Sequence, residues 1–260
     1  MNLGISYTIV GQGDPIIFIH GVGSRKYSWD NVVEELKSNY QCVTYSLRGH
    51  GDSLLPNGSN DFNLGDLVED LENLRQHLKL EKMHLVGHSL GGQIVPAYAR
   101  KYPHRAKTLT LLSTAAFRSD VEKQKILDLV EEMRKSGLEK VLPRLINRWY
   151  TENFASRNPD TVTKRIEMIK GMSLETFFRV FTIYANCTME NWLHEIKAPS
   201  LVMTGSEDIG CNPRLNQMIV EAMSQAELKI LEGLRHSINT ERPDIIARYI
   251  RIFLKQYKIM

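Results

Sequence analysis

Short apolar runs alternate with helical patterns along the first part of the chain, and this alternation is the feature that most restricts the fold. Each run is four to six residues long and ends at or near turn-forming residues, which predicts buried strands. Strands that are apolar along nearly their whole length are typical of a parallel sheet covered by helices on both faces. The predicted strands are residues 16–19, 42–47, 83–86 and 108–112, and the predicted helices between them are residues 29–39, 64–78 and 90–102.

A run of helical patterns interrupts this alternation after the fourth strand. It opens at Ser119-x-x-Glu122, a capping box that predicts the start of a helix. Strand and helix patterns alternate again after Pro199. We therefore predict an α/β fold with a mostly parallel sheet, in which residues 1–116 and 199–260 form the core and residues 117–198 form a helical cap inserted after the fourth parallel-type strand segment.

The overall composition argues against several classes of protein. The net charge of the 260 residues is +3, and no dense cluster of Lys and Arg predicts nucleic acid or an anionic membrane as a partner. The three cysteines form no disulfide framework and no CxxC pattern, and no His and carboxylate cluster has metal-ligand spacing, so we expect no metal and no organic cofactor. The N-terminus lacks a signal-peptide pattern, so we expect a cytoplasmic protein that does not span a membrane. The oligomeric state stays open, with a homo-oligomer as one alternative.

The segment Gly87-His88-Ser89-Leu90-Gly91 matches the pattern G-x-S-x-G. The pattern alone is common, but here the strand at residues 83–86 enters it and a helix follows from Leu90. That context is typical of a nucleophile elbow, a sharp strand-to-helix turn that presents a serine for attack. Ser89 is therefore the candidate nucleophile. The alternative is a glycine-rich turn whose serine has no chemical role.

A serine nucleophile needs a histidine as general base and an acid that orients the histidine. His236 is the best candidate among eight histidines, because it follows the predicted strand at residues 228–231 and so lies at the carboxyl edge of the sheet. The acid is expected after the strand at residues 201–204, where Glu207 and Asp208 are both available. We favour Asp208, because its distance from the strand end places it on the descending side of the turn.

Two backbone N–H groups are needed to stabilise the oxyanion of an acyl-transfer reaction. Leu90 directly follows the nucleophile at a helix N-terminus, which favours negative charge. Val22 lies in the glycine-rich loop His20-Gly21-Val22-Gly23, where the main chain can approach a substrate closely. We predict these two residues as the donors. The same loop lacks the pattern of a phosphate-binding loop.

These motifs, taken together and in order, resemble the α/β-hydrolase fold-1 superfamily. The resemblance is closest to the 3-oxoadipate enol-lactonase group, because of the helical insertion and the segments around residues 184–199 and 236–243. It implies that the insertion is a lid over the active site with an apolar lining. The alternative for its aromatic residues is that they form the core of the lid itself. The residues that carry the resemblance are His20-Gly21-x-Gly23, Arg48-Gly49-His50-Gly51-Asp52-Ser53, Gly87-His88-Ser89-Leu90-Gly91-Gly92, Thr204-Gly205-x-x-Asp208 and His236, and the candidate substrate contacts are Arg25, Trp149, Phe178, Tyr184 and Trp192.

The sequence thus predicts a serine hydrolase that cleaves a small carboxylic ester or lactone through an acyl-enzyme on Ser89. Hydrolysis of a C–C bond, an amide or a lactam on the same three residues stays open, as does transfer of the acyl group to an acceptor other than water. A ligand-binding receptor on a hydrolase scaffold is the alternative from another class. Arg48 is more readily explained as a brace for its loop than as a substrate contact.

Overall fold

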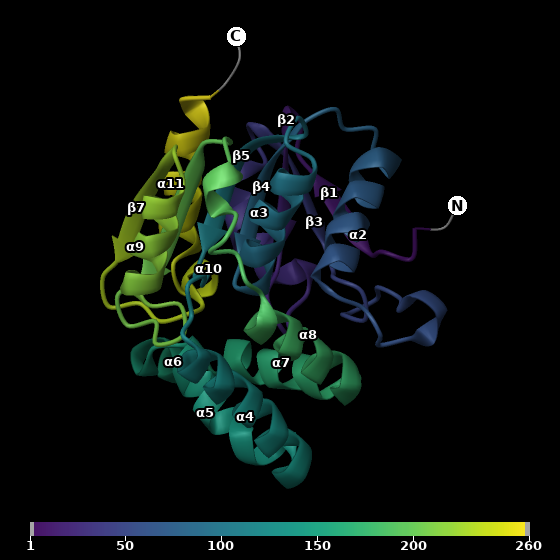
Figure 1. Cartoon of the computed structure of the whole chain (residues 1–260), viewed down its shortest axis with the longest axis vertical. Helices are drawn as coiled ribbons and strands as arrows, with labels where there is room; N and C mark the ends of the chain where they lie inside the picture. The colour runs from purple at the N-terminus through teal and green to yellow at the C-terminus, as the bar shows by residue number, and fades with distance from the viewer. Residues whose placement is uncertain (1–2, 258–260) are drawn as a thin grey trace.

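The computed structural model describes residues 3–257, and within these residues seven strands form one sheet in the order β1-β3-β2-β4-β5-β6-β7 (Figure 1). β1 runs antiparallel to β3, and all other neighbouring strands are parallel. The predicted α/β fold with a mostly parallel sheet is therefore confirmed. The strands are β1 (Tyr7–Val10), β2 (Asp14–Ile19), β3 (Tyr40–Tyr45), β4 (Met83–His88), β5 (Ala106–Leu112), β6 (Ser200–Gly205) and β7 (Ala226–Leu231).

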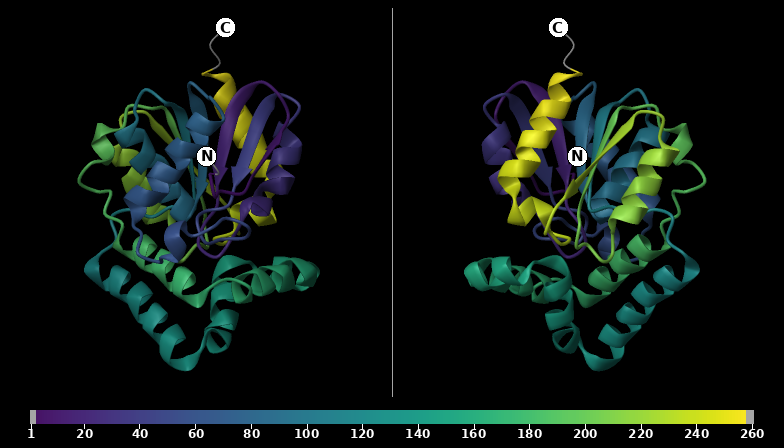
Figure 2. Two further views of the ribbon diagram at one scale, coloured as in Figure 1. Left: turned by 90° about the vertical axis from the view of Figure 1, so that its right-hand side faces the viewer. Right: turned by 90° about the vertical axis from the view of Figure 1, so that its left-hand side faces the viewer.

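Helices cover both faces of the sheet, which explains why its central strands are buried and largely apolar (Figure 2). On one face, α2, α3 and α9 contribute to the larger hydrophobic core. On the other face, α1 and α11 form a second core against side chains such as Phe18 and Trp29. These helices and the short ones between them are η1 (Lys26–Trp29), α1 (Asp30–Leu36), η2 (Pro56–Gly58), α2 (Leu64–His77), α3 (Leu90–Lys101), η3 (Leu193–Glu195), α9 (Pro213–Ala222), α10 (Ile238–Glu241) and α11 (Pro243–Lys255).

Five consecutive helices follow β5 and lie together at one end of the sheet, where Figures 1 and 2 show them as a separate layer. Their buried side chains join the larger core, so this layer packs on the rest of the molecule. The backbone N–H of Ser237 also donates to the Trp149 carbonyl at 2.9 Å. The division of the chain at residues 117 and 198 stays a prediction. The five helices are α4 (Asp120–Ser136), α5 (Leu138–Trp149), α6 (Glu152–Arg157), α7 (Pro159–Lys170) and α8 (Leu174–Asn186).

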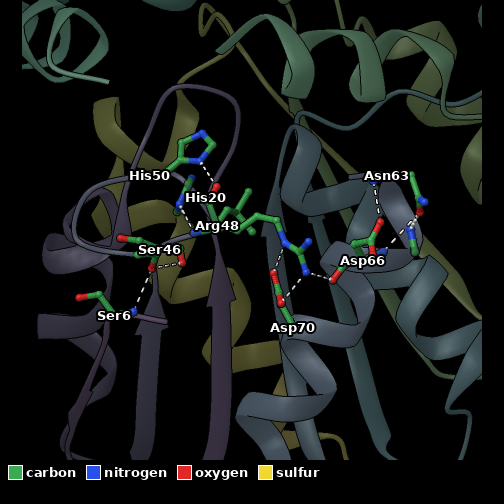
Figure 3. A network of polar contacts seen from close by, with 11 residues as sticks. Ser6, His20, Ser46, Arg48, His50, Asn63, Asp66 and Asp70 are labelled. Atoms are coloured by element: carbon green, nitrogen blue, oxygen red, sulfur yellow. Dashed lines mark hydrogen bonds and ion pairs between the residues drawn. The ribbon is translucent and has the colours of Figure 1, made fainter. Parts of the chain in front are cut away.

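A largely buried ion pair holds the loop after β3 against α2 (Figure 3). Arg48 donates to both oxygens of the Asp70 carboxylate, at 2.7 and 2.8 Å, and to the Asp66 carbonyl at 3.0 Å. In the same loop, the His50 ring bonds to the Arg48 carbonyl, and the His20 ring accepts from the Leu47 N–H at 2.9 Å. The guanidinium of Arg48 is thus committed to the structure of its own loop.

Replacement of Arg48 by methionine is expected to lower the free energy of unfolding by about 3 kcal/mol, because the Asp70 carboxylate would stay buried without its partner. A matched control is Lys101→Met, which removes a solvent-exposed partner of Glu69 on the same helix α2 and should cost less than about 1 kcal/mol. Urea unfolding of both variants measures the difference. An equal decrease in the free energy of unfolding of the two variants would show that the Arg48–Asp70 pair stabilises the fold no more than an exposed ion pair does.

No helix within residues 3–257 is long and apolar enough to cross a membrane.

Candidate active site

Ser89 occupies a strained turn between β4 and α3. Its backbone has φ 57° and ψ −114°, a conformation that residues other than glycine rarely adopt. The turn is tight enough that a Cβ on Gly91 would lie 2.1 Å from the Ile19 carbonyl oxygen, and one on Gly87 would lie 2.2 Å from the Gly91 oxygen. Only glycine fits at either position. The Ser89 N–H donates to the Leu112 carbonyl at 2.9 Å, which anchors the turn to β5.

Asp208 and His236 meet at the same edge of the sheet, from the loops after β6 and β7. The Asp208 Oδ2 atom lies 2.7 Å from Nδ1 of His236, and Oδ1 accepts from the N–H groups of Gly210 and Cys211 at 2.9 Å each. Only 1% of Asp208 is exposed to solvent. The carboxylate is therefore fixed on both oxygens and aimed at one ring nitrogen of the histidine.

Asp208 and His236 each stabilise the charged form of the other. Burial alone would raise the pKa of the Asp208 carboxyl, but the charge of His236 and the three hydrogen bonds hold it below its usual range. Burial alone would lower the pKa of His236, but the Asp208 carboxylate raises it above its usual range. Asp208 thus stays ionised, and the imidazolium form of His236 is stabilised.

Glu207 points away from this pair. Its side chain is 53% exposed, and its carboxylate lies 3.5 Å from Nε of Arg235. Of the two neighbouring carboxylates, only Asp208 contacts His236 among the residues described.

Ser89 and His236 line one cavity together with the loop after β2 and side chains from α4, α5, α7 and α8. The loop lies directly on the serine, because a Cβ on Gly21 would lie 2.9 Å from the Ser89 Cβ. Within residues 3–257, the N–H groups of Val22 and Leu90 donate to no other protein group, so both are free to bind an oxyanion. The cavity has a volume of about 40 Å³, which is room for a few water molecules.

The five candidate substrate contacts lie in different parts of the structure. Trp149 and Tyr184 line the cavity above Ser89. Phe178 is buried beneath the Arg134 guanidinium, which lies 4.5 Å from its ring centre, and Trp192 lies in an outer groove against Arg100. Arg25 lines a neighbouring, larger cavity. Of the five, only Trp149 and Tyr184 line the cavity that also contains Ser89.

The sequence pattern assigns no role to two buried residues near His236. His88 donates from Nε2 to the His236 carbonyl at 2.9 Å, and burial lowers its pKa to about 3, so it is neutral. It holds the His236 loop in place from within the nucleophile turn, and its position in the G-x-S-x-G segment was the one available signal. Cys211 is fully buried, with Sγ 3.1 Å from the Tyr184 hydroxyl. The contact between Cys211 and Tyr184 joins two segments that are far apart in the sequence, so no local pattern indicates it.

One group of side chains in the described part of the chain has metal-ligand chemistry, namely Asp208, Cys211 and His236, whose donor atoms lie within 4.8 Å of one another. An ion bound there would need Nδ1 of His236 and an oxygen of Asp208, which now bond to each other. It would break that hydrogen bond. Metal binding by these three residues is therefore incompatible with the hydrogen bond between Asp208 and His236 beside Ser89.

The chain is similar to known hydrolases over almost its whole length. It is 25% identical to 3-oxoadipate enol-lactonase 2 of Acinetobacter baylyi, in a match that covers 98% of this chain and 95% of that protein. The crystal structure of an enol-lactonase from Burkholderia xenovorans has a TM-score of 0.89 at 22% identity, with 96% of each chain covered. A thermophilic esterase from Thermogutta terrifontis, solved with malate bound, has a TM-score of 0.87 at 25% identity, with 98% of this chain and 94% of that chain covered.

The model of the α/β hydrolase fold family matches residues 14–243, which include the strained turn at Ser89, the Asp208–His236 pair and the helices between them. The resemblance inferred from the motifs is thereby confirmed. The chain belongs to the α/β-hydrolase fold family and is an enzyme of that family.

Proposed function

We propose that the protein is a serine hydrolase that cleaves a small carboxylic ester or lactone through an acyl-enzyme on Ser89. The observation that carries this proposal is the Asp208–His236 hydrogen bond of 2.7 Å in the same cavity that the strained Ser89 turn lines. A carboxylate in that position fixes the histidine tautomer so that Nε2 is free to take a proton.

The reaction has two halves. Ser89 Oγ attacks the substrate carbonyl while His236 Nε2 takes its proton, and the Asp208 carboxylate stabilises the imidazolium. The N–H groups of Val22 and Leu90 bind the oxyanion, and the imidazolium returns the proton to the departing alkoxide. Water then attacks the acyl-enzyme while His236 takes one of its protons, and the imidazolium returns that proton to Ser89 Oγ as the carboxylic acid leaves. With a lactone, the alcohol stays attached to the acyl group.

The first experiment is labelling with a fluorophosphonate, followed by a panel of p-nitrophenyl esters, lactones and amides. Labelling at Ser89 and turnover of esters or lactones support the proposal. Amide turnover without ester turnover would move the assignment to an amidase, and absence of both labelling and turnover would favour a binding protein.

The rate of hydrolysis should depend on pH through His236, which accepts the serine proton only when it is neutral. Since Asp208 raises the pKa of His236 above its ordinary 6.5, kcat/KM for p-nitrophenyl acetate should rise with pH and reach half its maximum above pH 6.5. Lowering the pH protonates His236 and removes the activity. A profile that is flat between about pH 5 and pH 8 would contradict this role.

We also propose that α4–α8 act as a lid that determines which acyl groups reach Ser89. Trp149→Ala enlarges the cavity and should shift the kcat/KM ratio toward longer acyl esters by about tenfold. The matched control is Phe178→Ala, which removes a ring from the same helical layer but outside the cavity and should leave the ratio unchanged. Rates for p-nitrophenyl acetate and octanoate measure both. An unchanged ratio in Trp149→Ala would argue that the lid does not select the acyl group.

A further inference from the structure

A second and much larger cavity adjoins the one above Ser89. Its volume is about 480 Å³, against about 40 Å³ above the serine. It lies between the loop after β2, helix α7 and the segment that follows His236. The two cavities share three lining residues, His88, Arg165 and Ser237. When the carbonyl group of a larger substrate lies at Ser89, the rest of that substrate can occupy the larger cavity on the far side of Arg165.

Arg165 forms the boundary between the two cavities and has no acidic partner. Its Nη2 atom donates to the Val22 carbonyl at 2.8 Å, and its guanidinium lies 4.8 Å from the Trp149 ring centre. Among residues 3–257, no carboxylate forms an ion pair with it, and burial lowers its pKa. The Arg165 side chain is partly buried and, within the described residues, has no carboxylate beside it, so an anion bound there would be stabilised by charged hydrogen bonds.

The rest of the larger cavity is also positively charged. Arg25 and Lys164 line it with Arg165, and the one carboxylate in the lining is Asp30. Arg25 Nε is buried without a hydrogen-bond partner. His88, the histidine in the lining, is neutral. Three cations against one carboxylate leave an excess of positive charge beside the candidate oxyanion donor Val22.

We propose that this cavity is a second substrate subsite, which binds an anionic group, carboxylate or phosphate, of the ester or lactone whose carbonyl reaches Ser89. The proposal rests on the hydrolase function proposed above and adds the class of its substrate. Because the Arg165 guanidinium bonds to Val22 itself, the anion lies close to the reacting carbonyl, so a short linker between the two suffices. Arg165 would then be a specificity-determining residue.

The test compares anionic and neutral members of matched ester pairs. On the alcohol side these are 3-acetoxybenzoate and its methyl ester, with 3-acetoxyphenyl phosphate as the phosphate probe. On the acyl side they are the p-nitrophenyl monoester of succinic acid and its methyl ester. The anionic member should have the higher kcat/KM on at least one side, by about 10- to 100-fold, the effect of one or two charged hydrogen bonds. The phosphate probe separates phosphate from carboxylate as the preferred group.

Arg165→Gln should reduce this preference to near unity. Since Arg165 also holds the Val22 loop, the readout is the ratio of anionic to neutral substrate within each variant, which a general loss of activity does not change. Within residues 3–257, the side chains of Arg25 and Lys164 form no hydrogen bond to Val22, so Arg25→Gln and Lys164→Gln should each lower the ratio partly. Arg157→Gln, an exposed arginine of the same helical layer, should leave it at the wild-type value.

The outcomes separate this proposal from the function on which it rests. If Ser89 reacts with a fluorophosphonate and neutral esters are hydrolysed, but neither anionic member is preferred, the subsite is wrong and the hydrolase function stands. A preference that persists in Arg165→Gln, Arg25→Gln and Lys164→Gln would also overturn the subsite. If Ser89 is not labelled and no ester is hydrolysed, the hydrolase function is wrong.

Discussion

Replacement of Ser89 by alanine is expected to lower kcat/KM for ester hydrolysis by about 10³-fold or more, as removal of the nucleophile does in other serine hydrolases. The change deletes one hydroxyl and leaves the surrounding cavity otherwise intact. The protein should stay folded, because the turn is held by its flanking glycines and by the bond from the Ser89 N–H to the Leu112 carbonyl. Purified variant assayed with p-nitrophenyl acetate and with a fluorophosphonate measures the loss.

A matched control is available on the neighbouring strand. Ser113 directly follows β5, is fully buried and also has a positive φ, of 45°. Ser113→Ala therefore removes the same hydroxyl from a similar backbone position and should retain both activity and labelling. If Ser89→Ala kept a large fraction of the wild-type rate, the acyl-enzyme mechanism would be wrong.

The architecture was largely predictable from local patterns. Most of the parallel strands are recognisable as short, largely apolar runs, because helices cover both faces of the sheet. The capping box at Ser119 and Glu122 gave the start of α4, where the Ser119 side chain accepts from the Glu122 N–H. The apolar strands and the start of α4 are both determined by residues that are close together in the sequence.

Elements at the margins of the sheet were missed for the opposite reason. β1 (Tyr7–Val10) consists of β-branched and aromatic residues, but it is only four residues long and two of them are exposed, so it lacks the apolar run by which the other strands are recognised. The short helices α6 and α10 have too few turns for a periodic pattern. Their positions depend on contacts with distant segments, such as the two hydrogen bonds from Thr151 to Glu241.

The same distinction applies to the site. Ser89, Asp208 and His236 each follow a recognisable strand, so the parallel sheet brings them to one edge, and the structure places Asp208 against His236. Their catalytic roles stay predictions. Arg165 could not be found this way, because its importance arises from how α7 packs over the loop after β2. Lid residues with the same helical spacing either line a cavity or form the core of the lid, and periodicity does not separate these outcomes.

Replacement of Asp208 by asparagine is expected to lower kcat/KM by about 10³- to 10⁴-fold, close to the effect of losing the nucleophile. An amide carries no charge to stabilise the imidazolium, and its NH₂ group facing Nδ1 would favour the wrong tautomer of His236. The pKa of His236 should fall as well, since the carboxylate is what raises it. The residual activity should therefore persist to lower pH than in the wild type.

Glu207→Gln is the control that makes this result specific. It makes the same chemical change one residue earlier in the same loop, but on a side chain that is half exposed and faces Arg235. Its kcat/KM should stay near the wild-type value, and its pH profile should not move. A general effect of lost negative charge near the site would lower both variants alike. A larger loss in Glu207→Gln than in Asp208→Asn would mean that the acid has been assigned to the wrong carboxylate, even though Asp208 lies 2.7 Å from His236, and that the loop rearranges before the reaction.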